Sequence, residues 1–254
     1  MGEWLFVEEP RSDNTPAGKC TIAWRADYGW ILFPACGLTI YQEVSTPCLM
    51  SQYFEIHPQT PQPRLINQVV DILRSGGVVV YPTDSCYALG CMLDNKSGLE
   101  RIYRIRRLNK GHHMSLVCVD LSSIATYAKV DNRNYRLLKS MTPGPYTFIL
   151  KATNEIPRRL LHPKRKSIGI RVPDNAIVHA LLTGLGEPMM STTLLMPEED
   201  YPLSDPYDIN QLLKADVDAV IDGGACGLEE TSVISLEAEV EVIREGKGDV
   251  GKLS

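Results

Sequence analysis

Short polar side chains follow an apolar run in the first half of the chain. Val78–Tyr81 is built of β-branched and aromatic residues, and Pro82 is followed at once by Thr83, Asp84 and Ser85. This composition predicts a strand that is buried on both faces. In open α/β sheets, ligands bind at the carboxyl ends of strands. The stretch therefore predicts one wall of a ligand site, with an ordinary polar turn as the alternative.

A second strand of the same design and a lone arginine extend this set. Pro188–Thr193 is an apolar run that ends in hydroxyl side chains, and Arg171 lies inside the apolar segment 168–173. Arginine is rarely buried without a partner, so Arg171 is expected to contact an acidic neighbour or an anionic ligand. Hydroxyl groups and guanidinium forks suit carboxylate and phosphate groups. They favour a reaction run by positioning and charge stabilisation, such as adenylyl transfer.

Other kinds of site have no support in the sequence. His112 and His113 are adjacent, and adjacent side chains on a strand point to opposite faces, so they do not form a metal-binding pair. No Ser-His-Asp set can be nominated, and no Gly-x-x-x-x-Gly-Lys phosphate loop is present. We therefore expect no metal ligand from protein side chains and no tightly bound organic cofactor.

Basic residues gather in two segments, and these have two interpretations. One segment is the end of a predicted helix around 101–107, where the helix dipole stabilises basic side chains that can simply be exposed to solvent. The other interpretation is a patch that binds RNA phosphates. The residues of this predicted patch are Arg104, Arg107, Lys110, Arg158, Arg159, Lys164, Arg165 and Lys166.

Composition sets limits on the class of protein. The 254 residues are 44% hydrophobic and 22% charged, with a net charge of −5, which is typical of a soluble globular protein without a global basic field. Any RNA contact must therefore use a local patch. The seven cysteines include no Cys-x-x-Cys pair, which favours a reducing, cytoplasmic location. No run approaches the roughly 18 apolar residues of a membrane span.

Strand and helix patterns interleave from residue 50 to 254, which predicts one α/β domain with a mixed sheet. The predicted helices are Pro63–Leu73, Asn95–Arg107, Leu121–Tyr127, Asn132–Met141, Asn175–Thr183 and Ile209–Lys214. The predicted strands are Val78–Tyr81, Tyr87–Leu93, Met114–Val119, Tyr146–Leu150, Ile168–Pro173, Pro188–Thr193, Val217–Ile221, Ser232–Leu236 and Val240–Arg244.

Residues 1–49 differ from the rest of the chain. They hold all three tryptophans and three of the seven cysteines, yet they show no sustained period of either strand or helix. Our hypothesis is that this extension is not native but an artefact of choosing an upstream start codon, with Met50 as the real start, or that it is poorly ordered. The alternative is a small appended element that is rich in strands.

Several spaced motifs together resemble the YrdC/YciO family, and the likeness is closest to its YciO branch. They occur in the family's order from Met50 to about Val250. The resemblance implies a single YrdC-like domain, a twisted mixed open sheet with helices and a concave basic face. The motifs are Pro82–Gly90, Thr142–Thr147, Ile170–Pro173, Ser191–Thr193, Thr231–Ile234 and Ile243–Gly246.

The resemblance also implies a chemistry. Synthases of this family use ATP with Mg²⁺, threonine and bicarbonate to make threonylcarbamoyl-adenylate, the intermediate for threonylcarbamoyladenosine in tRNA. It implies that Thr83 and Tyr87 hold threonine and that the other residues contact the nucleotide or line the same pocket. The substrate-binding residues expected on this basis are Thr83, Tyr87, Arg106, Arg171, Ser191, Thr193 and Arg244.

Two segments depart from the synthase pattern. Where the synthases carry Lys-x-Arg followed by proline, this chain has Arg104–Leu108, and where they carry Ser-x-Asn it has Ser191–Thr193. Arginine does not replace lysine conservatively at a phosphate site, and threonine lacks the asparagine amide. At about 1–3 kcal/mol for each lost contact, two losses slow a reaction roughly tenfold to many-thousandfold. The sequence thus predicts threonylcarbamoyl-adenylate synthesis or a diverged reaction linked to the tRNA modification, with a non-catalytic double-stranded RNA- or tRNA-binding protein as the alternative.

The expected start at Met50 can be tested directly. We expect mass spectrometry of N-terminal peptides from native cells to find chains that begin at Met50. A peptide that spans Leu49 and Met50 would contradict this expectation and favour the appended element.

Overall fold

The computed structural model describes residues 4–7, 21–26, 29–34, 50–108, 114–157, 160–161 and 164–253. The chain divides into two compact units, Met1–Pro47 and Cys48–Ser254. In the first unit, β1 (Trp4–Val7), β2 (Thr21–Ala26) and β3 (Gly29–Pro34) form an antiparallel sheet in that order. An appended element rich in strands would contain such a sheet, and the start at Met50 stays a prediction.

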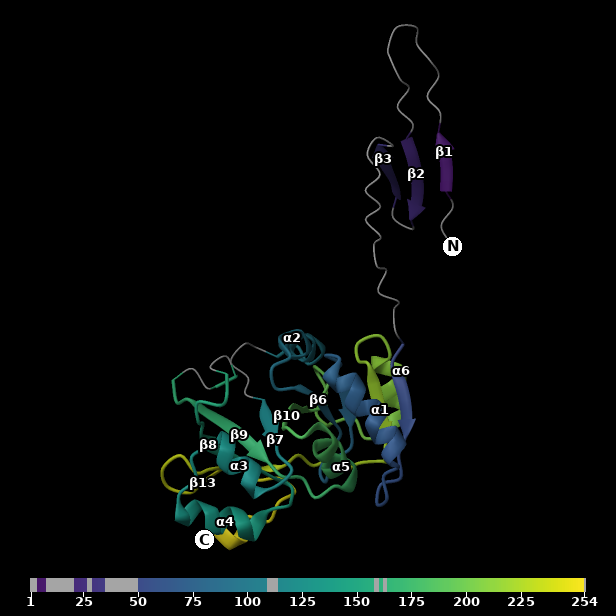
Figure 1. The fold of residues 1–254 in the computed structure, drawn as a ribbon. Coiled ribbons are helices and arrows are strands. Elements are labelled where there is room, and N and C mark those ends of the chain that lie inside the picture. The colour runs from purple at the N-terminus through teal and green to yellow at the C-terminus, as the bar shows by residue number, and fades with distance from the viewer. Residues whose placement is uncertain are drawn as a thin grey trace, which may run out of the picture. The chain divides into compact units, whose positions relative to one another are not determined.

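A ten-stranded mixed sheet organises the second unit, in the order β13-β12-β8-β9-β7-β10-β6-β5-β11-β4 (Figure 1). Parallel and antiparallel pairs alternate irregularly along it, as predicted for a mixed sheet. Its strands are β4 (Gln52–Glu55), β5 (Val79–Tyr81), β6 (Ala88–Met92), β7 (Ser115–Val117), β8 (Tyr146–Lys151), β9 (Ser167–Arg171), β10 (Met189–Thr193), β11 (Ala219–Asp222), β12 (Ser232–Ser235) and β13 (Glu241–Arg244).

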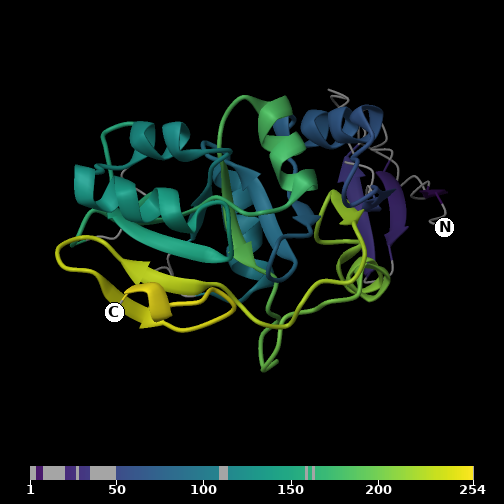
Figure 2. The same cartoon turned by 90° about the horizontal axis from the view of Figure 1, so that it is seen from below.

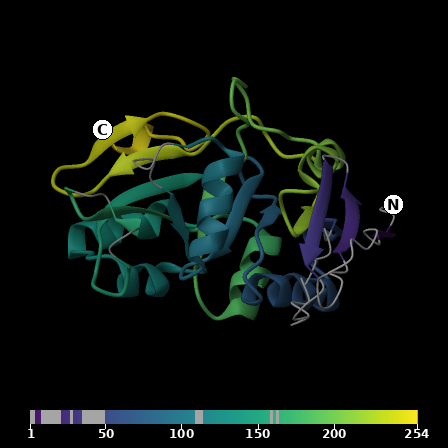
Figure 3. The same cartoon turned by 90° about the horizontal axis from the view of Figure 1, so that it is seen from above.

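Every helix that the sequence predicts is present. In Figure 2, α1 and α5 lie side by side, and Figure 3 shows α2 in front of the strands. The α-helices of the described residues are α1 (Pro63–Arg74), α2 (Lys96–Ile105), α3 (Leu121–Tyr127), α4 (Asn132–Met141), α5 (Ala176–Leu185) and α6 (Pro206–Leu213), and a short 3₁₀ helix spans Gly251–Leu253.

Capping side chains fix where the helices begin. The Asn175 side chain accepts hydrogen bonds from the backbone N–H groups of Ile177 and Val178 at the start of α5. Asp205 does the same for α6, which therefore begins at Pro206, three residues before the predicted start. These bonds satisfy donors that a helix leaves unpaired at its first turn.

The predicted strand at Val78–Tyr81 is buried on both faces, as its composition indicates. All four of its residues have an exposed fraction of 0%. Val78 and Val80 pack with residues of α2, whereas Val79 and Tyr81 pack with residues of α1 and α5. Successive side chains on a strand point to opposite faces, so the two helix layers lie on opposite faces of β5.

In the second unit, the sequence analysis missed one of the described strands. Strand β4 (Gln52–Glu55) pairs in parallel with β11 at the edge of the sheet, and only Phe54 within it is buried. Four residues with one buried side chain are too few to show a period of two. Within the part of the chain that the structure describes, no helix has the length and apolar character to cross a bilayer.

The packing of α5 gives a stability prediction. Leu181 has an exposed fraction of 0% and lies in the core with α1, so Leu181→Ala is expected to lower the free energy of unfolding by about 2–5 kcal/mol. Leu212 of α6 is 54% exposed, so Leu212→Ala should change it by no more than about 0.5 kcal/mol. Urea denaturation measures both values, and equal losses would contradict the packing described for α5.

Candidate functional site

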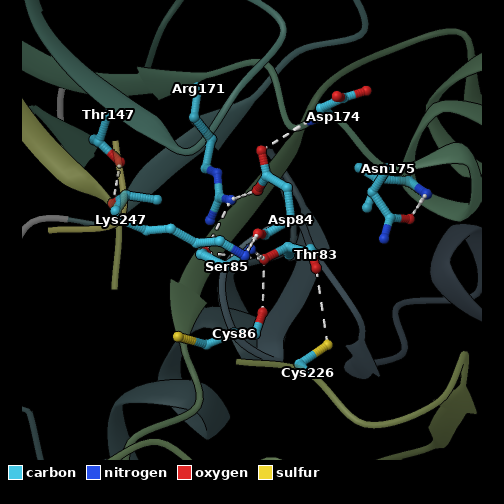
Figure 4. A network of polar contacts seen from close by, with 12 residues as sticks. Thr83, Asp84, Ser85, Cys86, Thr147, Arg171, Asp174, Asn175, Cys226 and Lys247 are labelled. Atoms are coloured by element: carbon cyan, nitrogen blue, oxygen red, sulfur yellow. Dashed lines mark hydrogen bonds and ion pairs between the residues drawn. The ribbon is translucent and has the colours of Figure 1, made fainter. Parts of the chain in front are cut away.

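The loop between β5 and β6 is held by its own hydrogen bonds. Thr83 Oγ1 accepts from the Ser85 N–H at 3.1 Å and donates to the Cys86 carbonyl at 2.6 Å, as Figure 4 shows. Pro82 cannot donate to the sheet, so β5 ends before it and the chain turns here. The hydroxyl of Thr83 thus shapes the turn, which presents Asp84 and Ser85 to Arg171 of β9.

A buried ion pair joins this loop to β9. Arg171 Nη2 lies 2.5 Å from Asp84 Oδ1 and 3.3 Å from Ser85 Oγ, and Asp84 Oδ2 accepts the Asp174 N–H at 2.9 Å (Figure 4). The Arg171 and Asp84 side chains are 6% and 8% exposed. Of the two partners expected for Arg171, an acidic neighbour or an anionic ligand, the structure shows the acidic neighbour. Arg171 Nε is also buried and has no hydrogen-bond partner in the described residues, so the guanidinium keeps a donor for a ligand.

Arg171 lines a cavity of about 490 Å³ whose floor is built from small residues. The strand register aligns Gly90 with Ser191, Ser191 with Ser115, and Ser115 with Gly169 across four neighbouring strands. A Cβ atom on Gly169 would lie 3.1 Å from Ser115 Oγ, so this row has little room for larger side chains. Small side chains in register leave the sheet surface hollow at this point.

Four arginines surround the cavity: Arg106, Arg165, Arg171 and Arg244. Arg106 follows the end of α2 and donates through Nη1 to the Thr193 carbonyl, and its Nε is buried without a partner in the described residues. Burial lowers the pKa of Arg106, but a guanidinium keeps its charge in proteins. Arg106 therefore offers a positive charge to a ligand.

The remaining two arginines, Arg165 and Arg244, are paired with carboxylates, as Arg171 is. Arg244 Nη1 lies 2.5 Å from Glu230 Oε2, and its Nη2 donates to the Thr231 carbonyl at 2.9 Å. Arg165 Nη1 lies 3.5 Å from Glu237 Oε2. Both pairs line the same cavity as Arg106 and Arg171.

The structure brings most of the predicted substrate-binding residues together. Arg106, Arg171, Ser191, Thr193 and Arg244 all line the cavity.

Thr83 and Tyr87 are not among the lining residues. Thr83 is engaged in its own turn, and the Tyr87 hydroxyl donates to the Gly224 carbonyl at 2.8 Å. Burial raises the pKa of Tyr87, so this hydroxyl stays protonated. Contact of these two side chains with threonine stays a prediction that rests on the resemblance.

The predicted RNA-binding patch divides into parts with different environments. Arg165 lines the cavity beside Glu237, and exposed Arg107 pairs with Glu198 at 3.3 Å. All five described side chains of the patch are exposed: Arg104, Arg107, Lys164, Arg165 and Lys166. Three of the predicted positions lie outside the described residues: Lys110, Arg158 and Arg159.

Sequence reasoning missed one cation beside the site. Lys247, which follows β13, donates to the Asp84 carbonyl at 2.6 Å (Figure 4). The flanking glycines were the available signal, because a Cβ on Gly246 would lie 2.4 Å from the Glu230 carbonyl oxygen and one on Gly248 would lie 2.3 Å from the Tyr146 ring. The glycines thus let the C-terminal segment pass close to the sheet and carry Lys247 to the loop.

The cysteines near the loop are protonated thiols at neutral pH. Burial raises the pKa of Cys86 to about 11 and also raises that of Cys226. A thiol is a much weaker nucleophile than a thiolate, so the surroundings of Cys86 and Cys226 do not activate them. Within the described residues, no group of three or more His, Cys, Asp or Glu side chains is arranged to hold a metal ion.

The sequence and the fold are both similar to those of known proteins. A family model for Sua5, YciO and YrdC proteins, described as "Telomere recombination", matches residues 71–246. YciO of Escherichia coli K12 is 56% identical over 202 residues, which are 79% of this chain and 98% of that protein. The crystal structure of E. coli YciO superposes with a TM-score of 0.77 and covers 80% of this chain and 98% of that one.

More distant relatives have names that state an activity or a ligand. A threonylcarbamoyl-AMP synthase of Vibrio vulnificus is 30% identical over 131 residues, 50% of this chain and 70% of that protein. The structure of P. abyssi Sua5 complexed with L-threonine gives a TM-score of 0.71 at 20% identity, covering 77% of this chain and 58% of that one. At that identity, the likeness shows the fold alone.

The buried ion pair gives the second stability prediction. Asp84→Ala leaves the Arg171 guanidinium buried without its counter-charge, so we expect a loss of about 3–5 kcal/mol in the free energy of unfolding. The matched control is Glu239→Ala, because the Arg133–Glu239 side chains are 67% and 85% exposed and such pairs contribute about 0–1 kcal/mol. Urea denaturation at neutral pH measures both, and a loss at Asp84 no larger than the control's would contradict the role given to the pair.

Proposed function

Because the chain belongs to the Sua5/YciO/YrdC family, we propose that its cavity binds a nucleotide together with a threonine-like small acid. The observation that carries the proposal is the convergence of four arginines on one cavity with a floor of small residues. Guanidinium groups bind phosphate and carboxylate oxygens through paired hydrogen bonds. The proposed reaction is threonylcarbamoyl-adenylate synthesis or a diverged reaction linked to threonylcarbamoyladenosine in tRNA.

The charges around the cavity indicate where an anion binds. Arg171, Arg244 and Arg165 each lie against a carboxylate, whereas the described contact of Arg106 is a neutral carbonyl. Arg106 and Arg171 also keep buried Nε donors without a protein partner in the described residues. An unpaired donor in a buried site costs free energy that a ligand oxygen can recover. We therefore place the anionic part of the ligand between Arg106 and Arg171.

The residues present suit chemistry by positioning. In adenylate formation, a carbamate oxygen of the carboxylated threonine attacks the α-phosphorus of ATP, and pyrophosphate leaves. Arg106 and Arg171 would hold the phosphates and stabilise their developing charge, while the hydroxyls of Ser191 and Thr193 would orient the ligand. The cavity carboxylates Glu230 and Glu237 are engaged by arginines, so Mg²⁺ would enter on the ATP phosphates.

Ligand binding by purified protein tests this proposal. We expect titration calorimetry to detect binding of MgATP and of L-threonine. We expect Arg106→Gln to weaken MgATP binding roughly tenfold to a hundredfold, because it removes a charged hydrogen-bond donor. The matched control is Arg133→Gln, which changes an exposed arginine paired with Glu239 and does not line this cavity.

Assays of the same purified protein distinguish adenylate synthesis, a diverged reaction and RNA binding. Labelled adenylate and pyrophosphate formed from ATP, threonine and labelled bicarbonate would support synthesis, and binding without product would leave the diverged reaction. Absence of small-molecule binding, together with tRNA or double-stranded RNA binding that weakens steeply with salt, would favour the RNA-binding alternative instead. That alternative rests on the exposed side chains of Arg104, Lys164 and Lys166.

A further inference from the structure

Tyr81 reaches the floor of the cavity from two strands away. Its ring, with an exposed fraction of 0%, lies against Gly90 of β6, and its hydroxyl donates to Ser191 Oγ on β10 at 2.5 Å. A Cβ atom on Gly90 would lie 2.7 Å from Tyr81 Cε1, so only glycine leaves room for the ring. Ser191 lines the cavity, whereas Tyr81 does not.

This hydrogen bond determines what Ser191 can do. A serine hydroxyl has one hydrogen and two lone pairs, and Tyr81 occupies one of those lone pairs. Within the described residues, Ser191 Oγ makes no other hydrogen bond, and the residue is only 2% exposed. Its own hydrogen is therefore left to donate to whatever the cavity holds.

Burial keeps Tyr81 in the donor role. It raises the pKa of Tyr81 to about 12, so the phenol stays protonated at neutral pH. A phenol is also a better donor than an alkyl hydroxyl, and a buried donor is costly to leave unpaired. The bond from Tyr81 to Ser191 is thus the favoured direction.

We propose that Tyr81 is a positioning residue that holds the Ser191 hydroxyl as a hydrogen-bond donor to an anionic oxygen of the bound ligand. The inference rests on the proposed function, because it needs a phosphate or carboxylate oxygen in the cavity. Arg171 and Arg106 line the same cavity, so the oxygen that Ser191 meets also lies within a positive field. Tyr81 acts through Ser191 and does not touch the ligand.

A double-mutant cycle tests the coupling. Titration calorimetry with MgATP, AMP, pyrophosphate and L-threonine is run on the wild type, Tyr81→Phe, Ser191→Ala and the double variant. For the ligand that Ser191 contacts, Tyr81→Phe should raise the Kd by about three- to tenfold in the wild type and leave it unchanged in the Ser191→Ala background. Equal effects in both backgrounds, or no effect in either, would overturn the proposal.

Controls separate this role from a structural one. Tyr53→Phe also removes a tyrosine hydroxyl hydrogen bond, to Asp222 at 2.7 Å, but Tyr53 does not line the cavity. We expect Tyr53→Phe to lower the free energy of unfolding without changing any Kd. Gly90→Ala should push the Tyr81 ring aside and reproduce the ligand selectivity of Tyr81→Phe.

A measurement without ligand keeps the two proposals distinct. If the wild type binds none of the four probes, the proposed function fails. Neutron diffraction from crystals of the ligand-free protein would then still decide the role of Tyr81. A deuteron of Tyr81 directed at Ser191 Oγ, with the Ser191 deuteron directed into the cavity, is expected. A Ser191 deuteron directed at Tyr81 Oη would overturn the inference.

Discussion

The Arg171–Asp84 ion pair is the interaction on which the site depends. Both side chains are almost fully buried, so the charges must stay within hydrogen-bond distance of each other. Asp84 meets this need by binding Arg171 with one oxygen and the Asp174 N–H with the other. This fixes the β5–β6 loop against the end of β9 and the segment that leads from it to α5, which lie almost ninety residues further along the chain. An arginine that is already held in this way can meet a ligand without paying the full cost of ordering its own side chain.

The cavity beside this ion pair results from the register of the sheet. Neighbouring strands bring Ser191, Ser115 and Gly169 side by side on one face, where bulky residues would fill the space. The Tyr81 ring lies over Gly90, which is the next residue of the row, and the Tyr81 hydroxyl reaches Ser191 Oγ. The hollow and its hydroxyl donor therefore have one origin, which is the row of glycine and serine residues across neighbouring strands.

Local patterns in the sequence were sufficient for the helices, for nearly all strands of the second unit and for the acidic neighbour of Arg171. Each of these depends on residue type and spacing within a few positions. The role of Arg165 could not be predicted in this way, because a basic run has the same composition whether it faces solvent or a cavity. The sequence also could not show that the hydroxyls of Thr83 and Tyr87 donate to the carbonyl groups of Cys86 and Gly224 and do not line the cavity. Contacts across strands depend on register, which no single segment encodes.

The two departures from the synthase motifs meet at one place in the structure. Arg106 lies in the segment that replaces Lys-x-Arg, and it binds the carbonyl of Thr193, which lies in the segment that replaces Ser-x-Asn. Residues in direct contact do not contribute independently to binding or catalysis, so the free energies of the two changes should not be added. The departures are therefore better understood as one local rearrangement at the Arg106 end of the cavity. Arg244, which lines the same cavity, keeps its own contacts with Glu230 and Thr231. Arg106 itself stands where the synthases also carry arginine, so a change in chemistry relative to them is expected where Arg104 replaces their lysine and Thr193 replaces their asparagine.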